Sequence, residues 1–201
     1  MNKTRLDSSG TPDHTVQRYH HGELRPALID CARRILEEEG LEALSLRGVA
    51  RRAGVSRQAP YHHFVDLNAL LAAVAATGFR ELAETSLDRM NRVTSMESRF
   101  KASGISYVMF ATSNPALFQL MFAGMRGNFS NDQELQAARY AAFAVLKNAL
   151  SDTGRADATD LSALKAWSLV HGLADLLNKR AVRPEDFGLL INEDLVENLL
   201  R

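Results

Sequence analysis

Residues 45–64 limit the possible folds more than any other part of the chain. Apolar residues at three- and four-residue spacing follow Ser45, a candidate N-cap, and predict a helix that ends at Gly54. Ser56 is a second candidate N-cap and predicts a short helix that ends near residue 64, although Pro60 disfavours helical geometry at the residue before it. Two helices of about eight residues that are joined through a glycine form a helix-turn-helix pattern.

The remaining sequence keeps the helical spacing and shows no sustained alternation typical of strands. A helix is predicted over residues 24–39 before Gly40, and a longer helix begins at Asp66. Further helices are predicted, between Pro, Gly and Asn breaks, at roughly 96–113, 115–125, 131–151, 158–179 and 187–200.

The expected fold is therefore all-α. We expect residues 23–65 to form an N-terminal three-helix domain that contains the helix-turn-helix, and residues 66–201 to form a larger C-terminal helical domain. Residues 1–22 contain too few apolar side chains to offset the entropy of ordering, so a flexible N-terminal arm is expected there.

A local basic island indicates the kind of partner. The chain has a formal net charge of zero, yet residues 43–64 contain four arginines and no Asp or Glu. Such an island in a neutral chain favours one local anionic partner, and with this motif the partner is double-stranded DNA. The alternative is that the arginines only form a solvated helix face, and that the short helices belong to an ordinary core.

The second helix of the motif enters the major groove in proteins of this kind. Arg57, Gln58 and His62 are the candidates for reading bases, since Arg can pair with guanine and Gln with adenine. The preceding helix supplies candidates for phosphate contacts, which position a protein without reading sequence. These candidates are Ser45, Arg47, Arg51 and Arg52.

Several sub-motifs occur in order: Tyr-His-His-Gly at 19–22, Ala-Leu-Ser-Leu-Arg-Gly-Val-Ala at 43–50, Ala-Gly-Val-Ser-Arg at 53–57 and Tyr-His-His-Phe at 61–64. Over residues 18–75 the chain closely resembles the DNA-binding domain of tetracycline-repressor (TetR) family regulators. The resemblance implies a homodimer that binds palindromic operators, most often as a repressor. It implies that residues 23–65 are the DNA-binding domain and that residues 66–201 are the helical ligand-binding and dimerisation domain. It also implies that Ser56 lies in the DNA-binding segment and that Tyr61 and His63 contact phosphate. Leu67 stands where the family commonly has a DNA-contacting lysine.

A weaker resemblance covers the C-terminal part, where Trp167 precedes the pair His171-Gly172 as in one branch of the family. Residues 107–125 are rich in Phe and Met, side chains that adapt to irregular apolar ligands, although such a stretch can equally be plain core. An unidentified small hydrophobic effector is the expected ligand. The candidate ligand-binding residues are Tyr107, Phe110, Phe118, Met121, Phe122, Trp167 and His171.

The helix predicted over residues 158–179 is apolar around nearly its whole circumference. Such a helix must be buried on more than one side, and a second copy of the chain can supply the further surface. Together with the last helix it predicts a four-helix homodimer interface. The alternative is that both helices pack within one monomer.

Other classes of function are disfavoured. Cys31 is the only cysteine, and the polar N-terminus lacks the apolar core of a signal peptide, which favours the cytoplasm. The uncharged residues 102–125 are interrupted by polar side chains, so no membrane span is expected. The sequence has no nucleophile elbow, phosphate-cradling glycine loop or metal-spaced His/Cys/Glu set, so we expect no enzyme, cofactor or metal.

The hypothesis is a sequence-specific DNA-binding transcriptional regulator, a repressor released from a palindromic operator by the effector. The alternative is a TetR-like scaffold without a small-molecule effector, which is either constitutive or controlled by a protein partner. A pocket closed and filled by its own side chains would favour the alternative.

Overall fold

A computed structural model describes residues 24–123, 131–154, 156 and 158–200. The predicted arm, 1–22, lies outside the described residues. Within them the chain is helical and forms no strand, which confirms the all-α prediction. The α-helices are α1 (Leu24–Glu39), α2 (Leu46–Arg52), α3 (Leu67–Met90), α4 (Met96–Ser113), α5 (Pro115–Ala123), α6 (Gln133–Ser151), α7 (Asp160–Asn178) and α8 (Glu193–Leu199). Short 3-10 helices are η1 (Leu41–Ala43), η2 (Ala59–His62) and η3 (Pro184–Phe187).

Side-chain caps determine where several helices begin. The Ser45 hydroxyl accepts a hydrogen bond from the Gly48 amide at 3.0 Å and starts α2. The Asp66 carboxylate accepts from the Ala69 amide at 2.8 Å and starts α3. Each cap satisfies an amide that has no partner inside its helix. The helix starts predicted at these two residues are confirmed.

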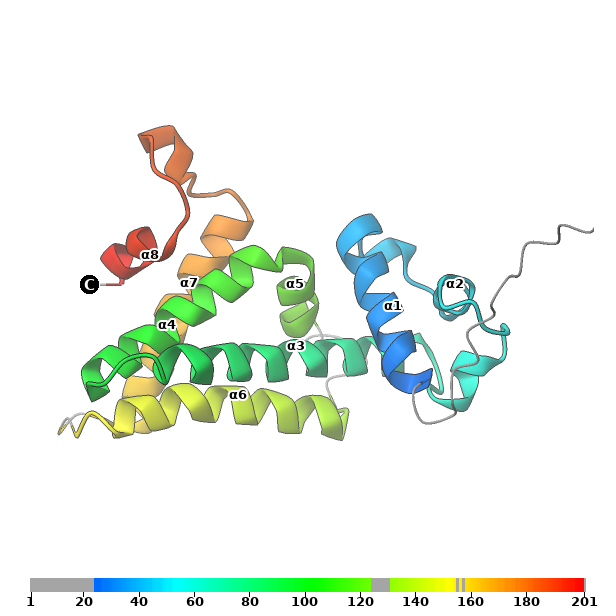
Figure 1. Cartoon of the computed structure of the whole chain (residues 1–201), viewed down its shortest axis with the longest axis horizontal. Helices are drawn as coiled ribbons and strands as arrows, with labels where there is room; N and C mark the ends of the chain where they lie inside the picture. The colour runs from blue at the N-terminus through cyan, green and yellow to red at the C-terminus, as the bar shows by residue number, and fades with distance from the viewer. Residues whose placement is uncertain (1–23, 124–130, 155, 157, 201) are drawn as a thin grey trace, which may run out of the picture.

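Helix α3 joins the N-terminal helices to the rest of the protein (Figure 1). Its 24 residues span about 36 Å at 1.5 Å per residue. The helix contacts α1 toward one end and α4, α5 and α6 along its length. Its buried run at 70–76 contacts neighbours on several sides, because small alanines let other helices approach closely. Helices α1 and α2 with η2 therefore form a head at one end of a helical body.

Two elements differ from the prediction. The helix expected over residues 56–64 is a turn followed by η2, because Pro60 has no amide hydrogen and amides along this segment bond three residues back. The helix expected over 187–200 is shorter. Gly188 has a φ of 70°, which ends η3, and Asn192 caps the seven-residue α8.

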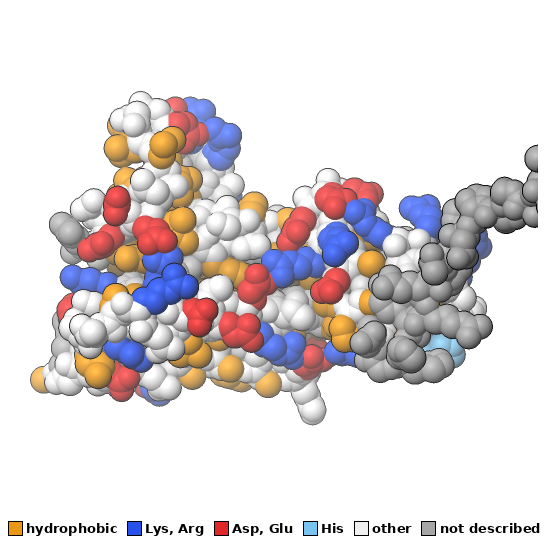
Figure 2. All heavy atoms as spheres, in the orientation of Figure 1, with side chains coloured by type: hydrophobic (Ala, Val, Ile, Leu, Met, Phe, Trp, Pro, Cys, Tyr) orange, Lys and Arg blue, Asp and Glu red, His pale blue; other side chains and the backbone are white. Residues whose placement is uncertain are grey.

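The surface carries two features that bear on partners. On the face in Figure 2, acidic and basic side chains are interspersed along the body, and hydrophobic side chains are visible on the projecting C-terminal part. Exposed apolar side chains include Leu161, Leu164, Leu169 and Leu176 of α7, and also Phe187 and Leu190. Among the described helices, none is both long enough and apolar enough to cross a membrane.

Candidate DNA-binding surface and effector cavity

The head exposes the side chains predicted to meet DNA. Ser45, Arg47, Ser56, Arg57, Gln58, Tyr61 and His62 are exposed, and His63 is half-buried. Arg47, Arg51 and Arg57 form no ion pair within the described residues. Three uncompensated guanidinium groups on a segment without carboxylates give the surface a positive potential that suits a phosphate backbone.

The local sequence explains how these side chains become exposed. Gly54 has a φ of 68°, in the left-handed region that favours glycine, and the chain turns there between α2 and η2. The Val55 amide donates to the Ala50 carbonyl at 3.0 Å, which ties the turn to α2. Pro60 and Phe64 are buried beneath η2, so the intervening Tyr61 and His62 are directed outward.

Arg52 differs from its neighbours. Its guanidinium pairs with Glu38, and it donates to Glu39 at 3.1 Å. This arginine therefore joins α2 to the end of α1, although the sequence suggested it for phosphate.

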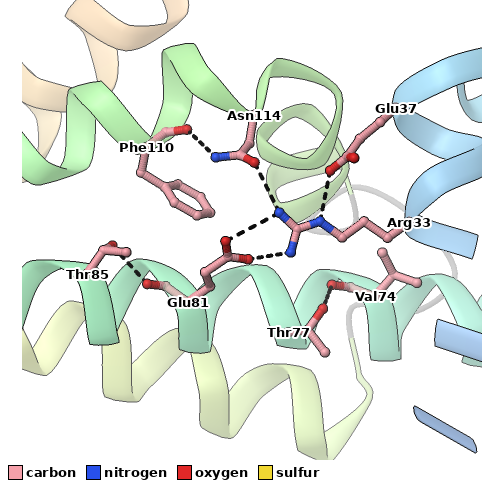
Figure 3. A network of polar contacts seen from close by, with 8 residues as sticks. All are labelled: Arg33, Glu37, Val74, Thr77, Glu81, Thr85, Phe110 and Asn114. Carbon is pink, nitrogen blue, oxygen red and sulfur yellow. Dashed lines mark hydrogen bonds and ion pairs between the residues drawn. The ribbon is translucent and has the colours of Figure 1, made fainter. Parts of the chain in front are cut away.

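A polar network joins the head to the body (Figure 3). Arg33 of α1 pairs with Glu81 of α3, and it also donates to the Asn114 amide oxygen at 3.0 Å. Its Nε donates to Glu37 at 2.8 Å. Asn114 lies at the junction of α4 and α5 and donates to the Phe110 carbonyl at 3.0 Å. The guanidinium of Arg33 thus connects α1 to α3 and to the α4–α5 junction.

A second connection runs through α6. The Glu134 carboxylate accepts from Arg25 of α1 and from Arg80 of α3, each at 2.6 Å. Burial raises the pKa of the Glu134 carboxyl, but the two arginines lower it by a larger amount. The pKa of Glu134 therefore lies below its ordinary value. The Arg25 guanidinium also lies 5.5 Å from the ring centroid of Phe64, next to η2. The first turn of α6 is therefore tied to the base of the DNA-binding segment.

The body contains a cavity of about 250 Å³ among α3, α4, α5, α6 and α7. Its walls are largely apolar, and one side chain in them carries a charge. The lining residues are Phe79, Leu82, Ser86, Ser103, Tyr107, Phe122, Arg139, Tyr140, Ala142, Phe143, Val145, Leu146, Trp167 and Val170. Apolar cavities with a few polar groups are the usual form of small-molecule sites.

Three aromatic side chains in this region form a polar chain. The Trp167 indole donates to the Tyr107 hydroxyl at 3.2 Å, and that hydroxyl lies 2.8 Å from His171 Nδ1. Since an indole can only donate, the hydroxyl hydrogen is free to bond to a neutral imidazole. Burial is the largest influence on the pKa of His171 and lowers it, whereas nearby Asp175 raises it and Lys179 lowers it. The pKa of His171 is lowered overall, which favours the neutral ring. Burial also raises the pKa of Tyr107.

The predicted ligand residues separate into several groups. Tyr107, Phe122 and Trp167 line the cavity, whereas Phe118 and His171 line an adjacent open hollow together with Phe122 and Trp167. Phe110 lies along a different groove, near Arg89. Met121 is 1% exposed and packs at Gly78 in the core.

Sequence reasoning missed the wall that α6 contributes. The positions 135, 139, 142 and 146 fall on one helix face, and Arg139 is the charged member of this otherwise apolar stripe. A charged residue inside an apolar helix face indicates a position that is not plain core, and this signal was present in the sequence. The contribution of α3, from Phe79 to Ser86, has no such signal, because its cavity-facing residues resemble ordinary core positions.

Two family models match the chain. The model described as "Bacterial regulatory proteins, tetR family" matches residues 28–74, which include α2 and η2. The model described as "Tetracyclin repressor-like, C-terminal domain" matches residues 100–195, from α4 into α8. The chain belongs to the TetR family of transcription regulators. These regulators bind DNA and are not enzymes, and the helix-turn-helix assignment is confirmed.

Individual proteins are similar to this chain over most of its length. The chain is 24% identical over 180 residues to the HTH-type transcriptional regulator YobS of Bacillus subtilis (strain 168), covering 89% of this chain and 87% of that one. It is 30% identical to a protein of unknown function from Rhodococcus sp. RHA1, with a TM-score of 0.75 and coverage of 92% and 93%. A TetR family regulator from Marinobacter aquaeolei VT8 has the same fold at 18% identity, with a TM-score of 0.65 and coverage of 89% and 94%.

Proposed function

We propose that this TetR-family regulator is a dimeric repressor that leaves a palindromic operator when a small hydrophobic effector enters its cavity. The observation that carries the proposal is the largely apolar cavity of about 250 Å³ in a chain whose head exposes Arg47, Arg51 and Arg57, which have no ion pair in the described part of the chain. Residues 23–65 are assigned to DNA binding, and residues 66–201 to effector binding and dimerisation. A bacterial repressor of this kind acts in the cytoplasm, where the DNA is.

The exposed face of α7 supports dimerisation. Leu161 and Leu169 are 60% and 57% exposed, although Val170 and Leu177 on the opposite side of the helix are buried. Leucines on both sides of one helix favour a second burying surface, and a second copy supplies it with two-fold symmetry. Two-fold symmetry places two heads about 34–36 Å apart on a palindrome, one turn of DNA.

The mechanism follows from the two polar connections. Helix α6 lines the cavity and also carries Glu134, which holds Arg25 and Arg80. An effector that displaces α6 or the α4–α5 junction perturbs the contacts of Arg25 or of Arg33 and so biases the position of the head. Two heads out of register with successive grooves bind the operator weakly.

The decisive experiment is selection of random duplex DNA by the purified protein, followed by sequencing. An enriched palindrome supports the proposal, and absence of enrichment by the folded protein contradicts it. On the selected site, Arg57→Ala is expected to relax base preference at one position, at a cost of about 1–3 kcal/mol. Arg47→Ala is expected to weaken binding to all sequences and to reduce the salt slope by about one. Equal effects of both variants on selected and random DNA would contradict these roles.

The competing function is a scaffold without a small-molecule effector. It requires a body filled by its own side chains, and the open cavity favours the effector-responsive function instead. Direct titration of the cavity, described below, separates the two.

A further inference from the structure

Arg139 occupies an unusual position for an arginine. It lies in the apolar stripe of α6 and is the charged residue among those that line the cavity within the described part of the chain. The residue is half-buried, and its neighbour Tyr140 is 64% exposed. Arg139 therefore lies where the cavity approaches solvent, with the apolar walls deeper inside.

The charge of Arg139 has no carboxylate partner within the described residues. The nearest acids along α6 are engaged elsewhere: Asp132 caps the helix, and Glu134 binds Arg25 and Arg80. The contact that Arg139 does make is with the ring of Tyr140, whose centroid lies 5.3 Å away. Guanidinium groups have five N–H donors in a planar fork that matches a carboxylate, so an arginine at the mouth of an apolar cavity is suited to an anionic ligand group.

The remaining walls define the rest of the ligand. Phe79, Leu82, Phe143 and Leu146 offer apolar surface, and the Tyr107 hydroxyl is already engaged by Trp167 and His171. One cation compensates one negative charge, so a dianion would leave a charge unpaired in the cavity. The volume of about 250 Å³ is many times that needed for a water molecule and admits a compact organic body.

We infer that the cavity binds an amphipathic monocarboxylate whose carboxylate pairs with Arg139 and whose apolar body lies against the apolar side chains of α3 and α6. The inference rests on the proposed function of the cavity as an effector site, and it adds the chemical class of the effector. Arg139 then determines ligand specificity, because its guanidinium binds a carboxylate more tightly than an alcohol or an amine of equal chain length.

The chain supplies its own reporter, because Trp167 is its only tryptophan and lines the cavity. Its fluorescence is to be titrated with octanoate, 1-octanol and octylamine, three probes that share one apolar chain. Octanoate is expected to bind about tenfold more tightly than octanol, since a hydrogen bond to a charged group contributes at least that factor. Octylamine is expected to bind most weakly, because its ammonium meets a guanidinium.

Variants identify the residue responsible. Arg139→Gln is expected to weaken the binding of octanoate about tenfold and to change the affinity for octanol by less than about twofold. Arg139→Lys should retain part of the preference, because it keeps the charge but loses the planar fork. Arg92→Gln, at an exposed arginine that does not line the cavity, is the matched control and should change neither probe.

Two outcomes overturn the inference in distinguishable ways. If octanoate and octanol bind the unmodified protein equally, the cavity remains an effector site but its preference for a carboxylate is wrong. If none of the three probes changes Trp167 fluorescence or the thermal midpoint of the protein, both the inference and the effector-binding function fail.

Discussion

Filling the cavity tests whether it is open space in solution. Ala142 lines the cavity and is half-buried on α6, and Ala142→Leu adds three carbon atoms directed into about 250 Å³. Burying three such carbon groups adds about 2.4 kcal/mol to the free energy of unfolding, at about 0.8 kcal/mol for each group. Fixing the leucine rotamer costs about 0.5–1 kcal/mol, and partial exposure removes a further fraction. The net expectation is a stabilisation of about 1 kcal/mol, or about 2–4 °C in the thermal midpoint of a chain this long.

The same helix provides a matched control. Ala149 is 1% exposed, belongs to a small packed cluster with Met90 and Ala102, and is not among the residues that line the cavity. Ala149→Leu makes the same chemical change in filled space and is expected to destabilise the protein by about 1–3 kcal/mol. The two variants are therefore expected to change the free energy of unfolding in opposite directions.

The assay is urea unfolding followed by far-ultraviolet circular dichroism, at one fixed protein concentration because a dimer unfolds in a concentration-dependent manner. Octanoate titration accompanies it, and Ala142→Leu is expected to weaken octanoate binding because the leucine occupies its space. If Ala142→Leu destabilises the protein as much as Ala149→Leu does, the body is filled in solution. That result would refute the reasoning and favour the scaffold without an effector.

Two further predictions concern the polar contacts. The pKa of His171 lies below its ordinary 6.5, so the unfolded chain binds a proton that the folded chain does not. The free energy of unfolding is therefore expected to decrease as pH falls below about 6.5, until the lower pKa of the folded state is passed. His171→Asn should flatten this part of a urea-unfolding profile between pH 5 and 7.5, and identical profiles would contradict the assignment. Glu134→Gln is expected to cost at most about 1 kcal/mol of stability, since the carboxylate is partly exposed, but to reduce octanoate-induced release from the selected DNA. Glu84→Gln, at an exposed acid outside both polar connections, is the control, and an equal release response in the two variants would argue against coupling through α6.

The head illustrates how far local sequence reaches. The caps at Ser45 and Asp66 and the turn at Gly54 act through contacts within a few residues, so their positions could be predicted from spacing alone. Pro60 has no amide hydrogen and disfavours helical geometry at the residue before it, and the segment forms a turn followed by the 3-10 helix η2 instead of the predicted helix. This departure from the predicted helix is therefore also local in origin.

The cavity shows the opposite case. The sequence predicts Tyr107, Phe122 and Trp167 in a ligand site, and it predicts Met121 there for the same compositional reason. The first three line the cavity. The close approach of α5 to Gly78 of α3 buries Met121 in the core instead. A Phe- and Met-rich stretch specifies apolar surroundings, but which face meets empty space depends on the neighbouring helices.

The sequence by itself determined the all-α fold, the helix-turn-helix and its exposed arginines, because periodicity, capping and local charge act over distances of a few residues. Only the tertiary structure decided that α6 supplies a cavity wall with Arg139 in it, and that Arg33 and Glu134 connect the head to the body. These contacts join residues 48 to 109 positions apart. Residue spacing within the sequence does not predict these contacts, because the pairing depends on how whole helices pack against one another.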